Sequence, residues 1–220
     1  MAIETNKGLS HHGKVVGVDL RRDRIVLACA VARWGRLRSV EVEELRVAPS
    51  SPDAALALES LLQERGWQDL PFVVGLRGAD TILRSTVLAP DDPRSMKDVL
   101  AEKLEQFDGV ASREVIHSYD AVYRDDGSVR VLLGLTRNEA AESAVALPIE
   151  AGLRLHRVMP TAMGLYNGSV RNLTKGEGPC LILDAGPGAT EVVIATTEEV
   201  LFARSFSAKL DSADPGTVEE

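Results

Sequence analysis

The residues best suited to chemistry in this sequence lie in a glycine-rich turn between two apolar segments. Asp184 ends the first segment, and Gly186, Gly188 and Thr190 follow it in the stretch Asp-Ala-Gly-Pro-Gly-Ala-Thr. Glycines let a backbone approach a ligand closely, and successive N–H groups in such a turn form an anion-binding nest. Thr190 adds a hydroxyl, and Asp184 could hold a metal-bound water. On the motif alone, we favour a plain Gly-Pro-Gly hairpin capped by an aspartate over a phosphate-binding turn.

A second aspartate occupies the same kind of position near the start of the chain. Asp19 ends the apolar segment Val-Val-Gly-Val and is followed by Leu20, Arg21 and Arg22. A phosphate-binding hairpin would carry glycine and serine or threonine here, because side chains with a Cβ crowd the backbone. Arginine can contact a phosphate directly. We favour the simpler interpretation of these residues as an exposed basic turn.

The sequence shows no other arrangement of catalytic or metal-binding residues. No serine lies in a Gly-x-Ser-x-Gly elbow, and no Walker-type phosphate loop occurs. His117 and His156 have no Cys, His or Asp cluster at the spacing of metal ligands, and His11 and His12 lie in the expected flexible lead-in. We therefore expect no metal site and no catalytic residue.

Composition excludes several classes of protein. The chain has 220 residues, and 25 Lys and Arg against 33 Asp and Glu give a net charge of −8. No broad basic field is present to attract nucleic acid or an anionic membrane surface. No run approaches the ~20 apolar residues that cross a bilayer, and the start of the chain lacks the apolar core of a signal peptide. The sequence therefore predicts a cytoplasmic protein without direct membrane insertion and without a nucleic-acid partner.

Two blocks of similar design position the two aspartates. The first block is predicted to contain a hairpin over 14–20 and 24–32, a bulged third strand over 37–47, a helix over 52–65 ended by Gly66, and a strand over 72–76. The later block is predicted to contain strands over 179–184, 190–196 and 199–206. Val-Gly-Val-Asp19 in the first hairpin matches Leu-Ile-Leu-Asp184 in the second, which indicates two halves built alike.

A small α+β unit is expected between the two blocks. Its predicted elements are a strand over 81–88, a helix that starts at Asp91-Asp92-Pro93, a hairpin over 114–123 and 129–135, and a helix from a capping box at 136–139 to about 151. A strand over 153–158 and a helix from Pro160 to about Asn172 then lead into the later block.

This ordered series of segments resembles the actin-like ATPase superfamily. Within it, the chain looks like the PilM family of type IV pilus assembly proteins, which is related to FtsA and to the cytoplasmic part of GspL. The segments that carry the resemblance are 15–19, 81–90, 114–120, 131–137, 151–153, 159–166, 183–186 and 201–205. The resemblance implies an α/β, actin-like (ribonuclease H-like) mixed-sheet lobe with an inserted α+β subdomain and a truncated second lobe.

The resemblance also implies how the chain is divided. The expected parts are a flexible lead-in over 1–13, subdomain 1A over 14–77 and 151–175, inserted subdomain 1C over 78–150, the first strands of lobe 2 over 178–207, and an acidic tail over 208–220. PilM-like proteins are cytoplasmic scaffolds that bind nucleotide between two lobes. They hold the cytoplasmic tail of the membrane protein PilN in a groove between 1A and 1C.

Site residues follow from the same resemblance. Asp19 matches the first phosphate loop, and the second loop is matched by Asp184, Gly186, Gly188 and Thr190. The residues expected to line the peptide groove are Leu83, Val87, Leu104 and Tyr119. The expected partners are a PilN-like bitopic inner-membrane protein and other components of a pilus or secretion platform, which would hold the chain at the inner membrane.

Two departures from the family pattern argue against ATP turnover. Arg21 and Arg22 replace the small residues of the first phosphate loop, and the sequence stops soon after the second hairpin. We therefore expect a scaffold without a cofactor, with bound ATP and Mg²⁺ as the alternative. In that alternative the chain is an active actin-like ATPase whose second lobe is completed by self-association. A third hypothesis is a fragment of a sugar-kinase-like enzyme. Such an enzyme should carry a sugar-binding carboxylate in a second lobe, and none is visible in this sequence.

Overall fold

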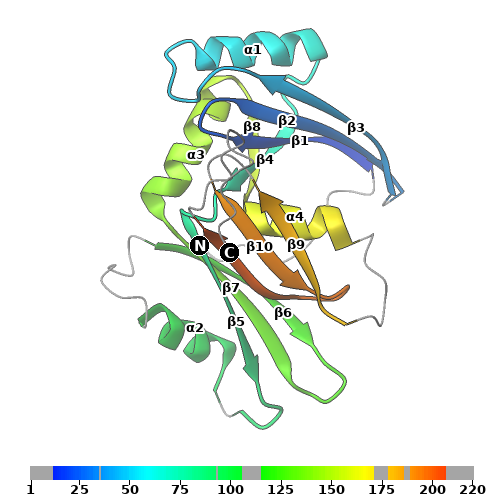
Figure 1. Ribbon diagram of the computed structural model, residues 1–220, viewed down its shortest axis with the longest axis vertical. Helices are drawn as coiled ribbons and strands as arrows, with labels where there is room; N and C mark the ends of the chain where they lie inside the picture. The colour runs from blue at the N-terminus through cyan, green and yellow to red at the C-terminus, as the bar shows by residue number, and fades with distance from the viewer. Residues whose placement is uncertain are drawn as a thin grey trace, which may run out of the picture. The chain divides into compact units, whose positions relative to one another are not determined.

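The computed structural model describes residues 12–34, 36–92, 94–105, 115–170, 178–185 and 189–206 (Figure 1). Contacts within the chain divide it into two compact units. Unit 1 consists of Met1–Leu76 and Arg137–Pro160, and unit 2 consists of Arg77–Thr136 and Thr161–Glu220. None of the described helices combines the length and the apolar character needed to span a membrane.

Unit 1 is built on a five-stranded mixed sheet. Its strands are β1 (His12–Leu20), β2 (Ile25–Arg33), β3 (Arg36–Leu45), β4 (Pro71–Leu76) and β8 (Arg154–Pro160), in the order β3-β2-β1-β4-β8. β1 and β2 form the predicted antiparallel hairpin, and β3 continues it through a register shift that confirms the expected bulge. β4 lies parallel to β1 and β8 parallel to β4, as crossover connections through helices require.

Two helices complete unit 1: α1 (Ala54–Arg65) and α3 (Asn138–Glu150). Leu58 and Leu62 of α1 are fully buried in one cluster with Phe72 of β4 and with the inward-facing residues of β1 and β2. Gly66 ends α1 with a φ of +63°, a left-handed conformation that favours glycine, as the sequence predicted. α3 contacts α1, β4 and β8.

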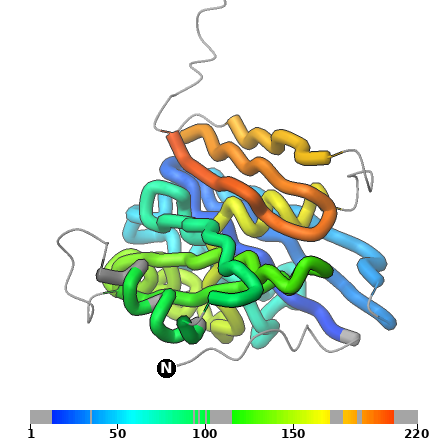
Figure 2. Tube along the Cα trace, turned by 90° about the horizontal axis from the view of Figure 1, so that it is seen from below, coloured from blue at the N-terminus to red at the C-terminus, as the bar shows by residue number. Residues whose placement is uncertain are grey.

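Unit 2 contains two three-stranded sheets and two helices. Its elements are β5 (Thr81–Leu88), α2 (Met96–Glu105), β6 (Val115–Tyr123), β7 (Val129–Arg137), α4 (Thr161–Ser169), β9 (Cys180–Ala185), β10 (Thr190–Ala195) and β11 (Val200–Phe206). The sheet orders are β5-β7-β6 and β11-β10-β9. β9, β10 and β11 lie side by side in both views (Figures 1 and 2).

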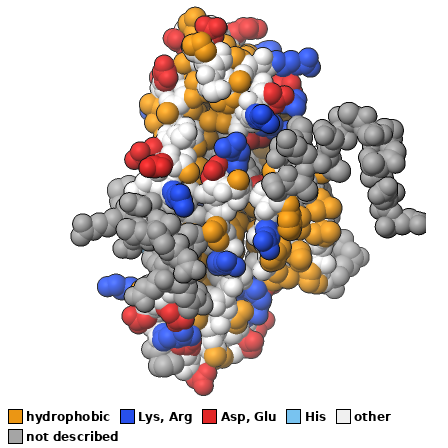
Figure 3. Space-filling view, turned by 60° about the vertical axis from the view of Figure 1, so that its left-hand side comes forward, with side chains coloured by type: hydrophobic (Ala, Val, Ile, Leu, Met, Phe, Trp, Pro, Cys, Tyr) orange, Lys and Arg blue, Asp and Glu red, His pale blue; other side chains and the backbone are white. Residues whose placement is uncertain are grey.

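The sheet of β9, β10 and β11 has one packed face and one open face. Val193, Ala195 and Val200 are buried against α4 on the packed face. The register places Leu181, Leu183 and Phe202 together on the other face, because partners in an antiparallel pair point the same way. Those large apolar side chains are exposed, and hydrophobic side chains gather over these strands in Figure 3.

Three predicted helix starts are wrong. Thr136 does not cap α3, because its Oγ1 donates to the backbone carbonyl of Asp80, 2.7 Å away, while β7 continues through Arg137. Pro160 ends β8 opposite Leu76 and so does not open α4.

The third wrong start is that of α2, which begins at Met96 and not at Asp91-Asp92-Pro93. Arg94 binds the Asp92 carboxylate in a local turn and lowers its pKa to about 2. Ser95 and Asp98 then form a reciprocal capping pair, in which the Asp98 N–H donates to Ser95 Oγ at 3.2 Å and the Ser95 N–H donates to the Asp98 carboxylate at 3.0 Å.

The compact units do not follow the segments expected from the resemblance. α3, which falls inside the expected 1C segment, belongs to unit 1, and α4, which falls inside the expected 1A segment, belongs to unit 2. The assignment of subdomains 1A and 1C and of lobe 2 stays a prediction. The expected acidic tail and most of the expected lead-in lie outside the described residues.

Candidate functional site

The first acidic hairpin neutralises its own aspartate. Asp19 lies at the end of β1, and Nε of Arg21 is 2.8 Å from Asp19 Oδ2. The backbone N–H of Arg21 donates to the carbonyl of Arg24 at 2.9 Å and closes the turn between β1 and β2. Arg24 in turn pairs with Glu44 on β3. The carboxylate expected in a first phosphate loop is therefore bound by a guanidinium from the same turn.

The second acidic hairpin is arranged differently. Asp184 at the end of β9 lies opposite Glu191 of β10, and its side chain is exposed. Thr190 lies opposite Ala185, so the pleat points Thr190 and Asp184 to opposite faces of the sheet. The expected Gly186 and Gly188 lie outside the described residues.

Glu191 links three segments that are far apart in the sequence. Its carboxylate accepts a hydrogen bond from the backbone N–H of Gly78 at 3.0 Å and another from the hydroxyl of Thr161. Thr161 is the first residue of α4, where a carboxylate is favoured by the helix dipole. A Cβ on residue 78 would lie 2.8 Å from Glu191 Oε1 and would collide with Ser205 of β11, which explains the glycine.

The structure describes the side chains of three of the four expected groove residues, and their role in peptide binding stays a prediction. Leu83 of β5 packs against the apolar cluster of unit 2, while Val87 of the same strand is 46% exposed. Tyr119 of β6 is also exposed, and it points away from the face that carries Asp120. Leu104 lies on α2, and its side chain is outside the described part of the structure.

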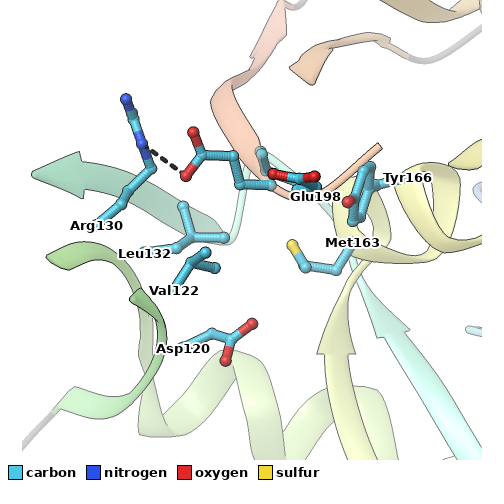
Figure 4. A pocket seen from close by; sticks show the side chains of 9 residues that line it. Asp120, Val122, Arg130, Leu132, Met163, Tyr166 and Glu198 are labelled. Carbon is cyan, nitrogen blue, oxygen red and sulfur yellow. Dashed lines mark ion pairs between the residues drawn. The ribbon is translucent and has the colours of Figure 1, made fainter. Parts of the chain in front are cut away.

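A pocket lies within unit 2, between β6, β7, α4 and the turn that leads into β11 (Figure 4). Its lining residues are Asp120, Val122, Arg130, Leu132, Met163, Tyr166, Glu198, Glu199 and Val200. Val122 and Leu132 give it an apolar wall, and Met163 and Tyr166 face them from α4 (Figure 4). The charged groups of the lining are the carboxylates of Asp120, Glu198 and Glu199 and the guanidinium of Arg130.

One of the three carboxylates is already paired. Arg130 Nε lies 2.9 Å from Glu199 Oε2, and Arg124 binds the other oxygen of the same carboxylate. Glu199 is only 11% exposed, so its charge depends on these two partners. Arg130 also donates to Ser85 Oγ at 3.0 Å, which fixes the guanidinium against β5.

The other two carboxylates have no cationic partner among the described residues. Asp120 accepts a hydrogen bond only from the adjacent backbone N–H of Ala121, at 3.0 Å, within the part of the chain that is described. Glu198 lies in the turn before β11, where its backbone N–H donates to Thr196 Oγ1 at 3.2 Å. Its side chain lines the pocket. Burial raises the pKa of Tyr166, and the carboxylates of Glu199, Asp120 and Glu198 raise it further.

Sequence reasoning missed both the Glu191 link and the pocket. Glu191 joins residues that are 30 and 113 positions away, and Glu199 meets an arginine 75 positions away. No local pattern signals such contacts. Within the described residues, no group of three or more His, Cys, Asp or Glu side chains could hold a metal ion.

Comparison with known proteins identifies solved structures of similar fold. No family model and no curated protein matches the sequence. The structure is similar to that of a PilM–PilN type IV pilus biogenesis complex, with 17% sequence identity and a TM-score of 0.71 over 89% of this chain and 62% of that chain. This chain thus spans less than two thirds of that protein's length.

A second similar structure belongs to a secretion system. The cytoplasmic domain of EpsL, an inner membrane component of the type II secretion system of Vibrio cholerae, matches with 15% identity and a TM-score of 0.57 over 88% of this chain and 71% of that chain. The expected α/β, actin-like fold is therefore confirmed, and the resemblance to PilM and GspL seen in the sequence is present in the fold.

Proposed function

We propose that this chain is a scaffold of a type IV pilus or type II secretion platform and binds the cytoplasmic tail of a PilN-like membrane protein. The observation that carries the proposal is the fold similarity to a PilM–PilN complex over nearly the whole chain. The similarity to EpsL, a component of an inner-membrane platform, points to the same class of assembly. The chain would then act in the cytoplasm and be held at the inner membrane by its partners.

Unit 2 offers two features that suit an extended peptide. β6 is an edge strand of its sheet among the described strands, so its backbone can pair with an added strand. The pocket beside it combines apolar walls with charged groups and lies on the face of β6 that carries Asp120 and Val122. Backbone pairing would supply affinity, and the pocket would supply specificity.

The absence of ATP turnover is part of the proposal. A first phosphate loop needs an aspartate and a turn of small residues, but here Arg21 occupies the turn and binds Asp19. A γ-phosphate or metal-bound water would have to displace this ion pair. The alternative, an ATP-binding or ATP-hydrolysing protein, is favoured by the second hairpin, whose sequence keeps Asp184, Gly186, Gly188 and Thr190.

Calorimetry with Mg-ATP separates the two functions. We expect no binding heat at nucleotide concentrations up to about 1 mM, where any physiological ATP site would be occupied. Saturable binding that disappears in Asp184→Ala would support the alternative. The matched control is Asp53→Ala, which alters an aspartate that makes no side-chain cap to α1.

The scaffold function is tested with the partner's tail. The probe is a fluorescently labelled peptide of the cytoplasmic tail of a PilN-like protein encoded beside this chain. We expect saturable anisotropy changes with a Kd of about 10–50 µM or tighter. No binding at about 100 µM to a protein with a folded circular dichroism spectrum would contradict the proposal.

A further inference from the structure

The turn between β2 and β3 in unit 1 gathers arginines around an exposed tryptophan. Arg33 ends β2, Trp34 lies in the turn, and Arg36, Leu37 and Arg38 open β3. All five side chains are exposed, that of Trp34 to 75%. These five residues are called the β2–β3 tip, and they lie at the right-hand end of the unit 1 sheet in Figure 1.

Two features of the β2–β3 tip work against the stability of a hairpin. Arg33 and Arg36 are direct cross-strand partners, and like charges in this arrangement repel each other. Trp34 has a φ of +54°, in the left-handed region that favours glycine or asparagine and that a bulky side chain rarely adopts. Positions that break local preferences in this way are typical of functional sites. The tip is therefore better explained by what it binds than by what it adds to the fold.

Charge is segregated along β3. The arginines of the tip have no acidic partner among the described residues, whereas Glu43 and Glu44, near the other end of the strand, are paired with arginines of other segments. The first glutamate after the tip, Glu41, is about 10 Å along the strand from Arg38, which exceeds the Debye length of ~8 Å at physiological salt. The tip is thus a local cationic surface that the net charge of −8 does not reveal.

An apolar stripe continues from the tip along β3. The register places Leu37, Val40 and Val42 opposite alanines of β2, so the three side chains lie on one face of the strand, and all three are exposed. Arginines beside an exposed tryptophan and aliphatic side chains are typical of surfaces that lie in the headgroup region of a membrane. A nucleic acid is bound by a broader basic surface and has no use for an aliphatic stripe.

We propose that the β2–β3 tip docks on the anionic surface of a phospholipid membrane. Trp34 and Leu37 would enter the headgroup region, and the three arginines would contact lipid phosphates. The choice of a membrane as the anionic surface rests on the proposed function, which holds the chain at the inner membrane. The contact is peripheral and reversible, because it uses one aromatic ring and a few charges.

Tryptophan fluorescence tests the docking directly. The chain has two tryptophans, and Trp67 is only 2% exposed, so a change of emission on adding vesicles reports Trp34. The probe is a vesicle of phosphatidylglycerol and phosphatidylcholine, and the matched neutral surface is a vesicle of phosphatidylcholine alone. We expect a saturable blue shift with the anionic vesicle, binding about tenfold or more weaker with the neutral one, and no shift in Trp34→Phe.

Variants then assign the charge, with binding measured by co-sedimentation with the same vesicles. Arg36→Gln combined with Arg38→Gln should weaken binding to the anionic vesicle about tenfold or more. Arg22→Gln combined with Arg46→Gln is the matched control, because it makes the same change in net charge at exposed arginines outside the tip. Equal binding to both vesicles, no binding to either, or full binding by the tip variant would each overturn the proposal. A Trp34 shift with a DNA oligonucleotide but not with the vesicles would assign the tip to nucleic acid and would also overturn it.

The partner's tail, titrated without vesicles, separates this inference from the proposed function. If the tail peptide binds and the anionic vesicle does not, the scaffold function stands and the membrane docking is wrong. If the vesicle binds as expected and the tail peptide does not, the docking stands and the proposed partner is wrong. A tip variant that loses the vesicle and keeps the peptide supports both proposals, because the peptide is expected on unit 2 and the tip belongs to unit 1.

Discussion

The two acidic hairpins of this chain share a plan and differ in what holds their carboxylates. In each, an apolar strand ends at an aspartate and an antiparallel strand follows. Asp19 is bound by Arg21 from its own turn, and both side chains are partly exposed. In the second hairpin, Glu191 beside Asp184 is bound by Gly78 and Thr161, from two distant segments.

The difference shows that the same strand–turn–strand arrangement can hold its carboxylates by local contacts or by contacts with distant segments. In the first hairpin, the Asp19 carboxylate is neutralised within its own turn, by Arg21. The second hairpin is tied into unit 2, so its position depends on residues near β5 and at the start of α4. We therefore expect loss of the Glu191 contacts to affect stability strongly and loss of the exposed Asp19–Arg21 pair to affect it little.

The largest expected effect comes from Gly78→Ala. The new Cβ would collide with Ser205 and lie 2.8 Å from Glu191 Oε1, so β11 or the Gly78 turn must move. We expect a loss of about 2–3 kcal/mol in the free energy of unfolding, measured by urea denaturation. Gly164→Ala in α4, where nothing lies within 4 Å of the new Cβ, should instead stabilise by roughly 0.5–1 kcal/mol. Equal stabilities of the two variants would contradict this account.

A smaller loss is expected from Glu191→Ala. The substitution leaves the Gly78 N–H and the Thr161 hydroxyl without this acceptor, which should cost about 1.5–2 kcal/mol in the same urea experiment. Glu41→Ala, on an exposed position of β3, is the matched control and should change stability by less than about 0.5 kcal/mol. A cost at residue 191 no greater than that of the control would show that the link does not stabilise unit 2.

The smallest effect is expected from Arg21→Ala. The pair with Asp19 is exposed, with 41% of the arginine and 36% of the aspartate side chain accessible, and exposed pairs contribute about 0–1 kcal/mol. The unfolding free energy should therefore fall by less than about 0.5 kcal/mol, and 1 M NaCl should reduce the difference further. A loss as large as that of Glu191→Ala would erase the distinction between the hairpins.

Much of the fold could be predicted because its signals are local. Alternating apolar residues identified both hairpins, and Gly66 marked the end of α1. The order of these elements was enough to indicate the actin-like fold. Local signals failed where a side chain had a competing partner: Thr136 bonds the Asp80 carbonyl and does not cap α3, and Arg94 holds Asp92 in a turn ahead of α2.

The candidate site was less accessible to prediction because it is made of long-range contacts. Asp19 and Arg21 could be recognised as neighbours in the sequence, but their ion pair requires the geometry of the turn. The pocket draws its lining from three strands, a helix and a turn, and Glu199 meets Arg124 across 75 residues. The local sequence around Asp120 and Glu198 does not indicate that the two residues line the same pocket.

The most direct test of the central claim is a titration of this chain with the PilN-like tail peptide, with and without Mg-ATP. A scaffold without ATP turnover should bind the peptide with the same Kd in both conditions, about 10–50 µM or tighter. Absence of binding by the folded protein, or binding that requires Mg-ATP, would contradict the account.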